Sequence, residues 1–130
     1  MSLTVGIKGR AEDVVCEHNT AQAACSGALA VFGTPFMAAL MEKAAWTSIA
    51  PCLTQGESTV GTKLNISHLS ATPVGMKVWA ESEITLVDGK RIELKVAAYD
   101  EKGLIGEGIH ERFIITDDRF LAKAAHKLEG

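Results

Sequence analysis

The chain has 130 residues, of which 47% are hydrophobic and 22% are charged, and its formal net charge is −3. This length suits one hydrophobic core, so we expect a single domain over residues 1–130. A slightly acidic chain with 5% aromatic residues has neither a basic surface nor many stacking side chains, which argues against nucleic acid as a partner. Three cysteines without CxxC spacing fit reduced thiols, and the start lacks a signal-peptide pattern. The sequence therefore predicts a cytoplasmic protein.

Residues 21–41 contain no charged side chain, and the segment is long enough to span a bilayer. It consists mostly of small residues, however, and Gly33-Thr34-Pro35 interrupts it in the middle. Glu42 follows directly. We therefore interpret the segment as a loop and helix buried inside a globular protein, and we expect no membrane association.

The strongest helix signal covers residues 35–50, an apolar segment with only two charged side chains. Thr34 is a good N-cap, and Pro35 suits the first helical position. Pro51 stops the helix because it cannot donate a backbone hydrogen bond. Since the segment is apolar on nearly every side, we expect the protein to enclose it.

After this helix the hydrophobic period changes to two, which is typical of strands. We expect strands at residues 58–68, 75–87, 90–100 and 104–115, one or two earlier strands within 4–18, a loop or short helix at 19–33, and an amphipathic helix at 117–130 capped by Thr116 or Asp117. Asp88-Gly89 is a two-residue hairpin signal. The pattern predicts a four-strand antiparallel meander with one solvated face.

Alternation assigns one face of these strands to the core. The inward side chains are Val60, Thr62, Leu64, Ile66 and His68, then Met76, Val78, Ala80, Ser82, Ile84 and Leu86, then Ile92, Leu94, Val96 and Ala98. One curved sheet wrapped around one apolar helix would bury both, so the fold class is α+β with the hot-dog arrangement. Four or five strands leave part of the helix uncovered, and we therefore expect a homodimer that extends the sheet.

Common cofactor and nucleophile motifs are absent. The sequence contains neither a P-loop nor a GxSxG elbow, and its GLIGEG segment does not fit the dinucleotide pattern GxGxxG. The four histidines show no metal-ligand spacing. We therefore expect no metal site and no cofactor.

Glu42 is the most informative residue, because an acid in the middle of an apolar helix is poorly solvated unless it is paired or near water. One interpretation places it at a solvated edge or a dimer contact, with Lys43 as its neighbour. The other places the carboxylate in a cleft, where burial raises its pKa and suits it to act as a base or nucleophile. The pattern alone does not choose between them.

His68 lies on the inward face of its strand, just before a turn marked by Pro73 and Gly75. A single inward histidine is more often a structural residue than a catalytic one. An inward glutamate in the same small domain favours the second role, since Glu42 and His68 can orient each other. Thr34 adds a hydroxyl and helix N–H groups that could bind a reacting oxygen.

Two further residues are candidates for support. Gly61 lies inside a strand, where glycine marks a bulge or a close backbone approach to a ligand. The segment His110-Glu111-Arg112 places His110 and Arg112 on one strand face. Arg112 could bind a phosphate or a carboxylate, although a surface ion pair is the simpler interpretation.

Three segments together resemble the fluoroacetyl-CoA thioesterase family of hot-dog proteins: FGTPFMAALMEKAAW, VGTKLNISHLSATPVG and GIHERFII. The resemblance runs from about Val31 to Ile115 without a gap. It implies hydrolysis of an acyl-CoA thioester, with Thr34, Glu42 and His68 as the catalytic set. It also implies that Gly61 and Arg112 support the substrate.

The resemblance weakens upstream of the helix. Residues 19–30, NTAQAACSGALA, lack the phenylalanine-bearing lid with which the fluoroacetyl-specific enzyme recognises fluorine. The expected substrate is therefore a short- or medium-chain acyl-CoA rather than fluoroacetyl-CoA in particular.

Helix geometry places the implied catalytic residues apart. Thr34 and Glu42 are separated by about 12 Å along one helix axis, at about 1.5 Å per residue. We therefore expect a site shared across the dimer, with Thr34 from one chain and Glu42 from the other. Either Glu42 attacks the thioester directly, or Glu42 and His68 activate water or the Thr34 hydroxyl.

Two other functions fit the same fold. A hot-dog domain could sense acyl-CoA without hydrolysing it, but a pure binder has no need of a buried carboxylate. An enoyl-CoA hydratase would need an Asp/His pair near the helix start, and the sequence has no aspartate between Asp13 and Asp88.

Overall fold

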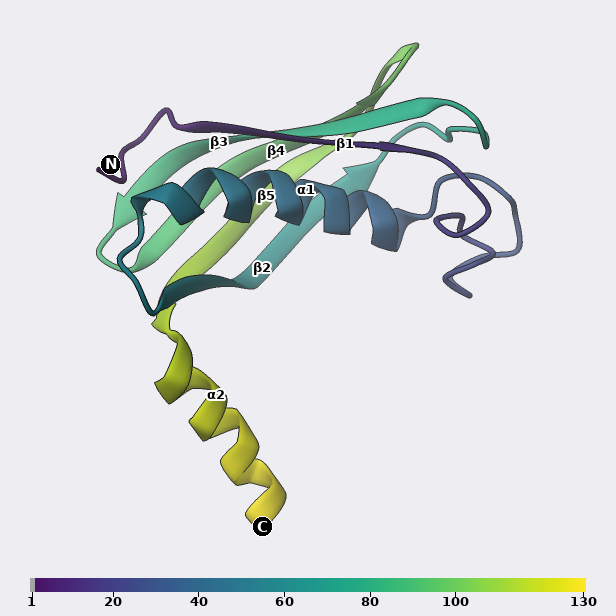
Figure 1. The fold of residues 1–130 in the computed structure, drawn as a ribbon. Helices are drawn as coiled ribbons and strands as arrows, with labels where there is room; N and C mark the ends of the chain where they lie inside the picture. The colour runs from purple at the N-terminus through teal and green to yellow at the C-terminus, as the bar shows by residue number, and fades with distance from the viewer. Residues whose placement is uncertain (1) are drawn as a thin grey trace.

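The computed structural model describes residues 2–130, which form one five-stranded antiparallel sheet and a helix lying across it (Figure 1). The elements are β1 (Lys8–Val14), α1 (Thr34–Ile49), β2 (Glu57–His68), β3 (Lys77–Asp88), β4 (Arg91–Asp100), β5 (Gly103–Thr116) and α2 (Asp117–His126), with short 3₁₀ turns at Ala50–Cys52 and Lys127–Glu129. The predicted α+β hot-dog fold is confirmed, including the order of its elements along the chain.

The sheet order is β1-β3-β4-β5-β2, which corrects one expectation. Only β3, β4 and β5 form the predicted meander, whereas β2 pairs antiparallel with β5. The reason is that β1 occupies the free edge of β3. The edge of β5 is then the one left for β2, so β1 and β2 are the two edge strands.

Helix α1 packs with six buried side chains against β1, β3, β2 and β4. These side chains are Met37, Leu40, Met41, Ala44, Ala45 and Ile49. The predicted range of 35–50 is confirmed to within one residue at each end, and Pro51 lies in the 3₁₀ turn that follows. The helix passes so close to β1 that a Cβ added to Gly9 would overlap the backbone carbonyl of Ala44.

The prediction that Thr34 is the N-cap of this helix is wrong. Gly33 is the N-cap, with an extended backbone (φ −79°, ψ 139°), and no side chain caps the helix start. Thr34 is the first helical residue. Its hydroxyl bonds to His68 instead of turning back to the helix backbone.

A bulge in β2 changes which side chains face α1. The register between β2 and β5 shifts between Gly61 and Lys63, and a Cβ added to Gly61 would point at the Glu42 carboxylate. Val60 lies between Thr59 and Gly61, which face Arg112 and Glu42, so Val60 faces away from the helix. Thr62 is the extra residue of the bulge and is exposed, so the predicted inward orientation of Val60 and Thr62 is wrong. Beyond the bulge, Leu64, Ile66 and His68 are each partly buried, as predicted.

The inward faces of β3 and β4 form the centre of the core. In β4 the predicted set of Ile92, Leu94, Val96 and Ala98 is fully buried. In β3 the alternation holds as far as Ile84, where a second bulge shifts the register. Val87 rather than Leu86 then packs against the buried cluster around Ile49 and Ile84. The curved sheet therefore buries its central strands against α1, as the two-residue period indicates.

The segment before α1 is a loop rather than a short helix. Its ends are tied by isolated bridges between Thr20 and Phe32 and between Val31 and Pro73, and Phe32 is buried in the core. Across residues 2–130, no helix has both the length and the apolar character needed to cross a membrane. The charge-free segment 21–41 is thus divided between this loop and the first half of α1.

Two smaller predictions concern the hairpin and the last helix. The turn between β3 and β4 consists of Gly89 and Lys90, one residue later than predicted, because Asp88 pairs with Arg91. Gly89 has a φ of +63°, which a glycine adopts without strain. Helix α2 follows Thr116 as predicted and has no buried residue. Figure 1 shows it standing away from the sheet.

Candidate functional site

The start of α1 and the end of β2 bring Thr34 and His68 together. Thr34 Oγ1 lies 2.7 Å from His68 Nδ1, although the two residues are far apart in the sequence. Burial lowers the pKa of His68 below its usual 6.5. The backbone of Ser70 raises this pKa, but by less than burial lowers it. A neutral imidazole can accept a hydrogen bond from the threonine hydroxyl through Nδ1. The pair thus has the arrangement of a hydroxyl nucleophile beside its base.

The other ring nitrogen of His68 faces the interior. Nε2 is buried, and no hydrogen-bond partner for it lies among residues 2–130. Because atoms of the same chain already cover Nε2, a group arriving from outside would meet Thr34 rather than this nitrogen. The exposed part of the pair is the threonine, whose side chain is open to solvent.

The helix start offers fewer backbone donors than an ordinary N-terminus. Pro35 has no N–H, and the N–H groups of Phe36 and Met37 both donate to the Gly33 carbonyl at 3.0 Å. The polar group that this end of α1 presents to His68 is therefore the Thr34 hydroxyl.

Glu42 lies in a second cluster, on the part of α1 that faces β2 and β5. Its Oε2 is 3.6 Å from Arg112 Nη1, and its side chain is 41% exposed. Within one chain, this exposure fits the solvated edge of the first interpretation. The carboxylate lies at an edge that solvent reaches, yet it is paired with a buried cation rather than with its neighbour Lys43.

Arg112 is buried, so the interpretation as a surface ion pair is wrong. Its side chain is 7% exposed. Its Nε donates to Thr59 Oγ1 at 2.8 Å, and its Nη2 donates to the Thr59 carbonyl at 2.9 Å. These bonds to β2 hold the guanidinium against the helix, close to Glu42.

Gly61 leaves room for this cluster. An added Cβ would lie 2.8 Å from Glu42 Oε2, 3.2 Å from His110 Cε1 and 3.3 Å from Arg112 Nη1. Of the two alternatives predicted for Gly61, the bulge is found, directly after this residue. The group that approaches the backbone here is the Glu42 carboxylate.

His110 is the site residue that the sequence analysis did not select. Its side chain is 0% exposed, its Nδ1 is 2.8 Å from the Lys63 carbonyl, and its Nε2 is 3.0 Å from Arg112 Nη1. Burial lowers the pKa of His110 and the Arg112 charge lowers it further, while the Lys63 carbonyl and Glu42 act in the opposite direction. The sequence did contain one indication of this role, because His110 and Arg112 lie two residues apart and so share one face of their strand.

The two clusters are separate within one chain. Thr34 and Glu42 are eight residues apart on α1, which corresponds to about 12 Å along its axis. The structure joins Thr34 to His68, and Glu42 to Arg112 beside Gly61. It does not bring Glu42 to the Thr34 hydroxyl.

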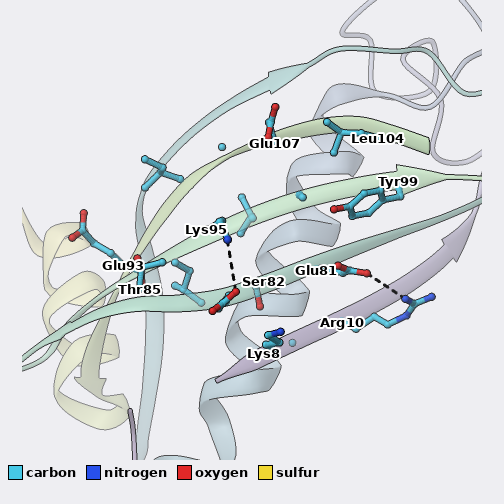
Figure 2. Close-up of a pocket in the computed structure, with 17 residues that line it drawn as sticks. Lys8, Arg10, Glu81, Ser82, Thr85, Glu93, Lys95, Tyr99, Leu104 and Glu107 are labelled. Atoms are coloured by element: carbon cyan, nitrogen blue, oxygen red, sulfur yellow. Dashed lines mark hydrogen bonds and ion pairs between the residues drawn. The ribbon is translucent and has the colours of Figure 1, made fainter. Parts of the chain in front are cut away.

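A wide groove lies elsewhere, on the outer face of the sheet (Figure 2). Its volume is about 1110 Å³, and it is lined by charged side chains such as Arg10, Glu81 and Lys95. None of the five site residues implied by the resemblance lines it. A smaller groove of about 320 Å³ borders the second cluster, with Trp46, Leu53 and Arg112 in its walls. Within residues 2–130, no group of His, Cys, Asp and Glu side chains is arranged to bind a metal ion.

Comparisons with known proteins agree with this fold. The sequence model of the family described as fluoroacetyl-CoA-specific thioesterase matches residues 15–118. A fluoroacetyl-CoA thioesterase from Streptantibioticus cattleyicolor is 41% identical over 97 residues, which are 75% of this chain and 70% of the relative. The solved structure of a fluoroacetyl-CoA thioesterase gives a TM-score of 0.93 at 34% identity, covering 98% of both chains. A Thermus thermophilus protein described as a thioesterase superfamily member gives 0.89 at 30% identity, covering 97% of this chain and 93% of its own.

Proposed function

Because this chain belongs to the fluoroacetyl-CoA-specific thioesterase family, we propose that it hydrolyses a short- or medium-chain acyl-CoA to a free acid and coenzyme A. The observation that carries the proposal is the 2.7 Å contact between Thr34 Oγ1 and His68 Nδ1. A hydroxyl open to solvent and paired with a neutral imidazole can act on a thioester, whose carbonyl carbon is electrophilic. No cofactor takes part, since coenzyme A belongs to the substrate.

In the proposed mechanism, Thr34 Oγ attacks the thioester carbonyl carbon while its proton passes to His68 Nδ1. The tetrahedral intermediate expels the coenzyme A sulfur, which takes the proton from His68, and an acyl ester remains on Thr34. Water, activated by the Glu42 carboxylate together with His68, then attacks this ester. The Thr34 oxygen leaves with the proton from His68, which releases the acid and restores the hydroxyl. An acyl group found on Glu42 instead of Thr34 by peptide mass spectrometry would contradict this order of steps.

Glu42 enters the proposed site from a second chain. We propose a cytoplasmic homodimer in which Thr34 and His68 of one protomer face Glu42 of the other. Three features support this arrangement: the separation of Thr34 and Glu42 on one helix, the exposed Glu42 carboxylate, and the unpaired edge of β2. Cys16, Cys25 and Cys52 are free thiols, as suits a reducing compartment.

Gly61 and Arg112 complete the proposed site on the substrate side. Arg112 lines the smaller groove, and Gly61 keeps the backbone of β2 clear of Glu42. A substrate bound beside Glu42 would therefore meet a buried positive charge and a backbone without a side chain.

Thiol release from a panel of acyl-CoAs tests the function. Acetyl-, butyryl-, hexanoyl-, crotonyl- and fluoroacetyl-CoA are each incubated with the protein, and free coenzyme A is followed with a thiol reagent. We expect release from at least one of them. Binding without release would instead identify a non-catalytic acyl-CoA-binding module, and loss of crotonyl absorbance without free thiol would identify a hydratase.

A further inference from the structure

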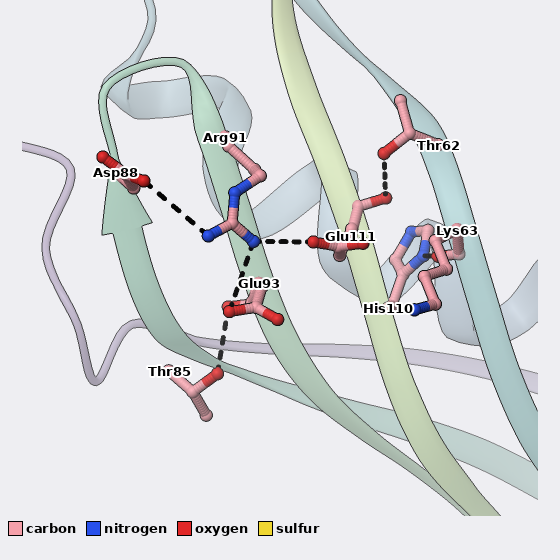
Figure 3. Close-up of polar contacts among 8 residues, drawn as sticks. All are labelled: Thr62, Lys63, Thr85, Asp88, Arg91, Glu93, His110 and Glu111. Atoms are coloured by element: carbon pink, nitrogen blue, oxygen red, sulfur yellow. Dashed lines mark hydrogen bonds and ion pairs between the residues drawn. The ribbon is translucent and has the colours of Figure 1, made fainter.

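His110 has two contacts that allow only one state of its ring. The Lys63 carbonyl can only accept a hydrogen bond, so His110 Nδ1, 2.8 Å away, must carry a proton. Figure 3 shows His110 on β5 beside Lys63 on β2. The guanidinium of Arg112 can only donate, so His110 Nε2, 3.0 Å from Nη1, must accept. Both bonds form only in the neutral tautomer protonated on Nδ1.

Arg112 is oriented by the strands around it. Its Nε and Nη2 donate to the hydroxyl and the carbonyl of Thr59, and its Nη1 donates to His110. Three acceptors in different directions determine the plane of a rigid guanidinium. This orientation exists without any contribution from Glu42.

Glu42 is the member of this cluster with no hydrogen bond to Arg112 among those that the structure gives. Its Oε2 lies 3.6 Å from Arg112 Nη1, too far for a hydrogen bond of ordinary length. The carboxylate is therefore attracted by a fixed charge but is not locked to it, and its side chain remains 41% exposed. Any movement of the guanidinium would move the position at which Glu42 is most stable.

We propose that His110 is a positioning residue, which acts through Arg112 to set the place of the Glu42 carboxylate in the site. The inference rests on the proposed function, in which Glu42 takes part in turnover. It adds a residue that touches neither the substrate nor Thr34. The contacts run from the Lys63 carbonyl, directly after the β2 bulge, through His110 and Arg112 to Glu42.

Two substitutions separate positioning from simple packing. His110→Gln keeps an acceptor near the place of Nε2 and so retains the bond from Arg112. His110→Asn keeps a donor near the place of Nδ1 and so retains only the bond to Lys63. We expect His110→Asn to lower kcat by roughly 100-fold, as a misplacement of about 1 Å can, with KM changed less than about threefold. His110→Gln should stay within about tenfold of the wild-type kcat.

The kinetic result has clear contrary outcomes. Equal kcat losses in the two variants, in step with their thermal stability, would show a purely structural role and overturn the proposal. So would a folded His110→Asn variant with wild-type kcat. If neither variant folds, Thr59→Val provides the test, because it removes the acceptor for Arg112 Nε while keeping the side-chain shape. Its kcat should then fall, and a wild-type kcat would overturn the proposal.

A second readout does not depend on activity. The Nε–H of Arg112 donates to Thr59 in a buried position, so its ¹⁵N NMR signal reports the orientation of the guanidinium. We expect the signal to be retained in His110→Gln and to shift or broaden in His110→Asn. A wild-type protein that releases no thiol would refute the proposed function, whereas an unchanged Arg112 signal in His110→Asn would refute the positioning role.

Discussion

The Thr34 hydroxyl lies where the first turn of α1 meets the last residue of β2. It is exposed to solvent, whereas the imidazole beside it is partly buried. This difference in environment keeps the base neutral and the nucleophile accessible, which hydroxyl-based acyl transfer requires. The chemistry of the proposed site therefore depends on two side chains held by different elements of one chain.

Substitutions of Thr34 test this pairing. Thr34→Val removes the hydroxyl but keeps the side-chain shape, and we expect kcat to fall by roughly 100-fold or more, since the nucleophile is lost. Thr34→Ser retains the hydroxyl and should keep most of the activity. Because Thr34 is exposed and no side chain caps the helix, the melting temperatures of both variants should stay near that of the wild type. Thiol release at saturating acyl-CoA and a thermal melt would check this, and full activity in Thr34→Val would exclude Thr34 as nucleophile.

The pH dependence of the reaction should follow His68. Only the neutral imidazole can take the proton of Thr34, so kcat/KM should fall as His68 becomes protonated. Burial lowers the pKa of His68 below its usual 6.5, so activity should persist below pH 6.5 and decline only at still lower pH. A kcat/KM profile measured between about pH 4.5 and 8.5 would give the apparent pKa. A decline that begins above pH 6.5 would contradict the assignment.

At the scale of the elements, the packing of α1 on β1 depends on a residue without a side chain. A Cβ at Gly9 would overlap the Ala44 carbonyl and lie 2.7 Å from Ser82 Oγ, and the helix backbone cannot rotate away as a side chain can. We expect Gly9→Ala to destabilise the fold by about 1–3 kcal/mol, the usual range for overpacking. Lys8→Ala, at an exposed position of the same strand, is the matched control. Chemical denaturation of both variants measures the difference, and equal stabilities would contradict the packing argument.

The sequence pattern predicted the elements well because alternation and apolar character are local properties. The helix, the inward side chains of β4 and the tail helix could all be read from short windows. Gly61 indicated that β2 could contain a bulge, but the effect of the bulge on the faces of Val60 and Thr62 could not be read, because an extra residue changes which way its neighbours point without changing the residues themselves. The pairing of β2 with β5 was equally invisible, since it depends on where β1 lies.

The candidate site was predictable in part. The resemblance to a known family selected Thr34, Glu42 and His68, and the structure places two of these three within hydrogen-bond distance. The burial of Arg112 was missed because a His-Glu-Arg segment looks like solvated surface. Its partners, Thr59 and His110, come from two strands whose pairing no local pattern indicates.

At the scale of the whole molecule, the proposed dimer has a direct test in mixed protomers. If Thr34 and Glu42 act across the interface, inactive Thr34→Val and inactive Glu42→Gln chains should form hybrids with one intact site and one doubly altered site. Random mixing makes half of the dimers hybrid, so about a quarter of the sites should regain activity. The two purified variants are unfolded together, refolded and assayed, with each variant refolded alone as control.

The contrary result is equally clear. If both residues act from the same chain, every site in the mixture carries one substitution, and activity should stay at the level of the controls. Sedimentation of the mixture would establish that dimers formed. A monomer with full activity would refute the shared site.

Helix α2 stands away from the sheet in one chain (Figure 1). It has no buried residue, and Phe120 and Leu121 are exposed on it, as is Leu128 in the 3₁₀ turn that follows. A ten-residue helix of this kind is only marginally stable in water without a surface to pack on. Hydrogen exchange of its backbone amides therefore reports whether a second chain packs on the helix. In dilute solution they should exchange with deuterium almost as fast as those of an unfolded peptide. If a second chain covers α2, exchange should slow as the protein concentration rises, while the amides of β4 stay protected throughout.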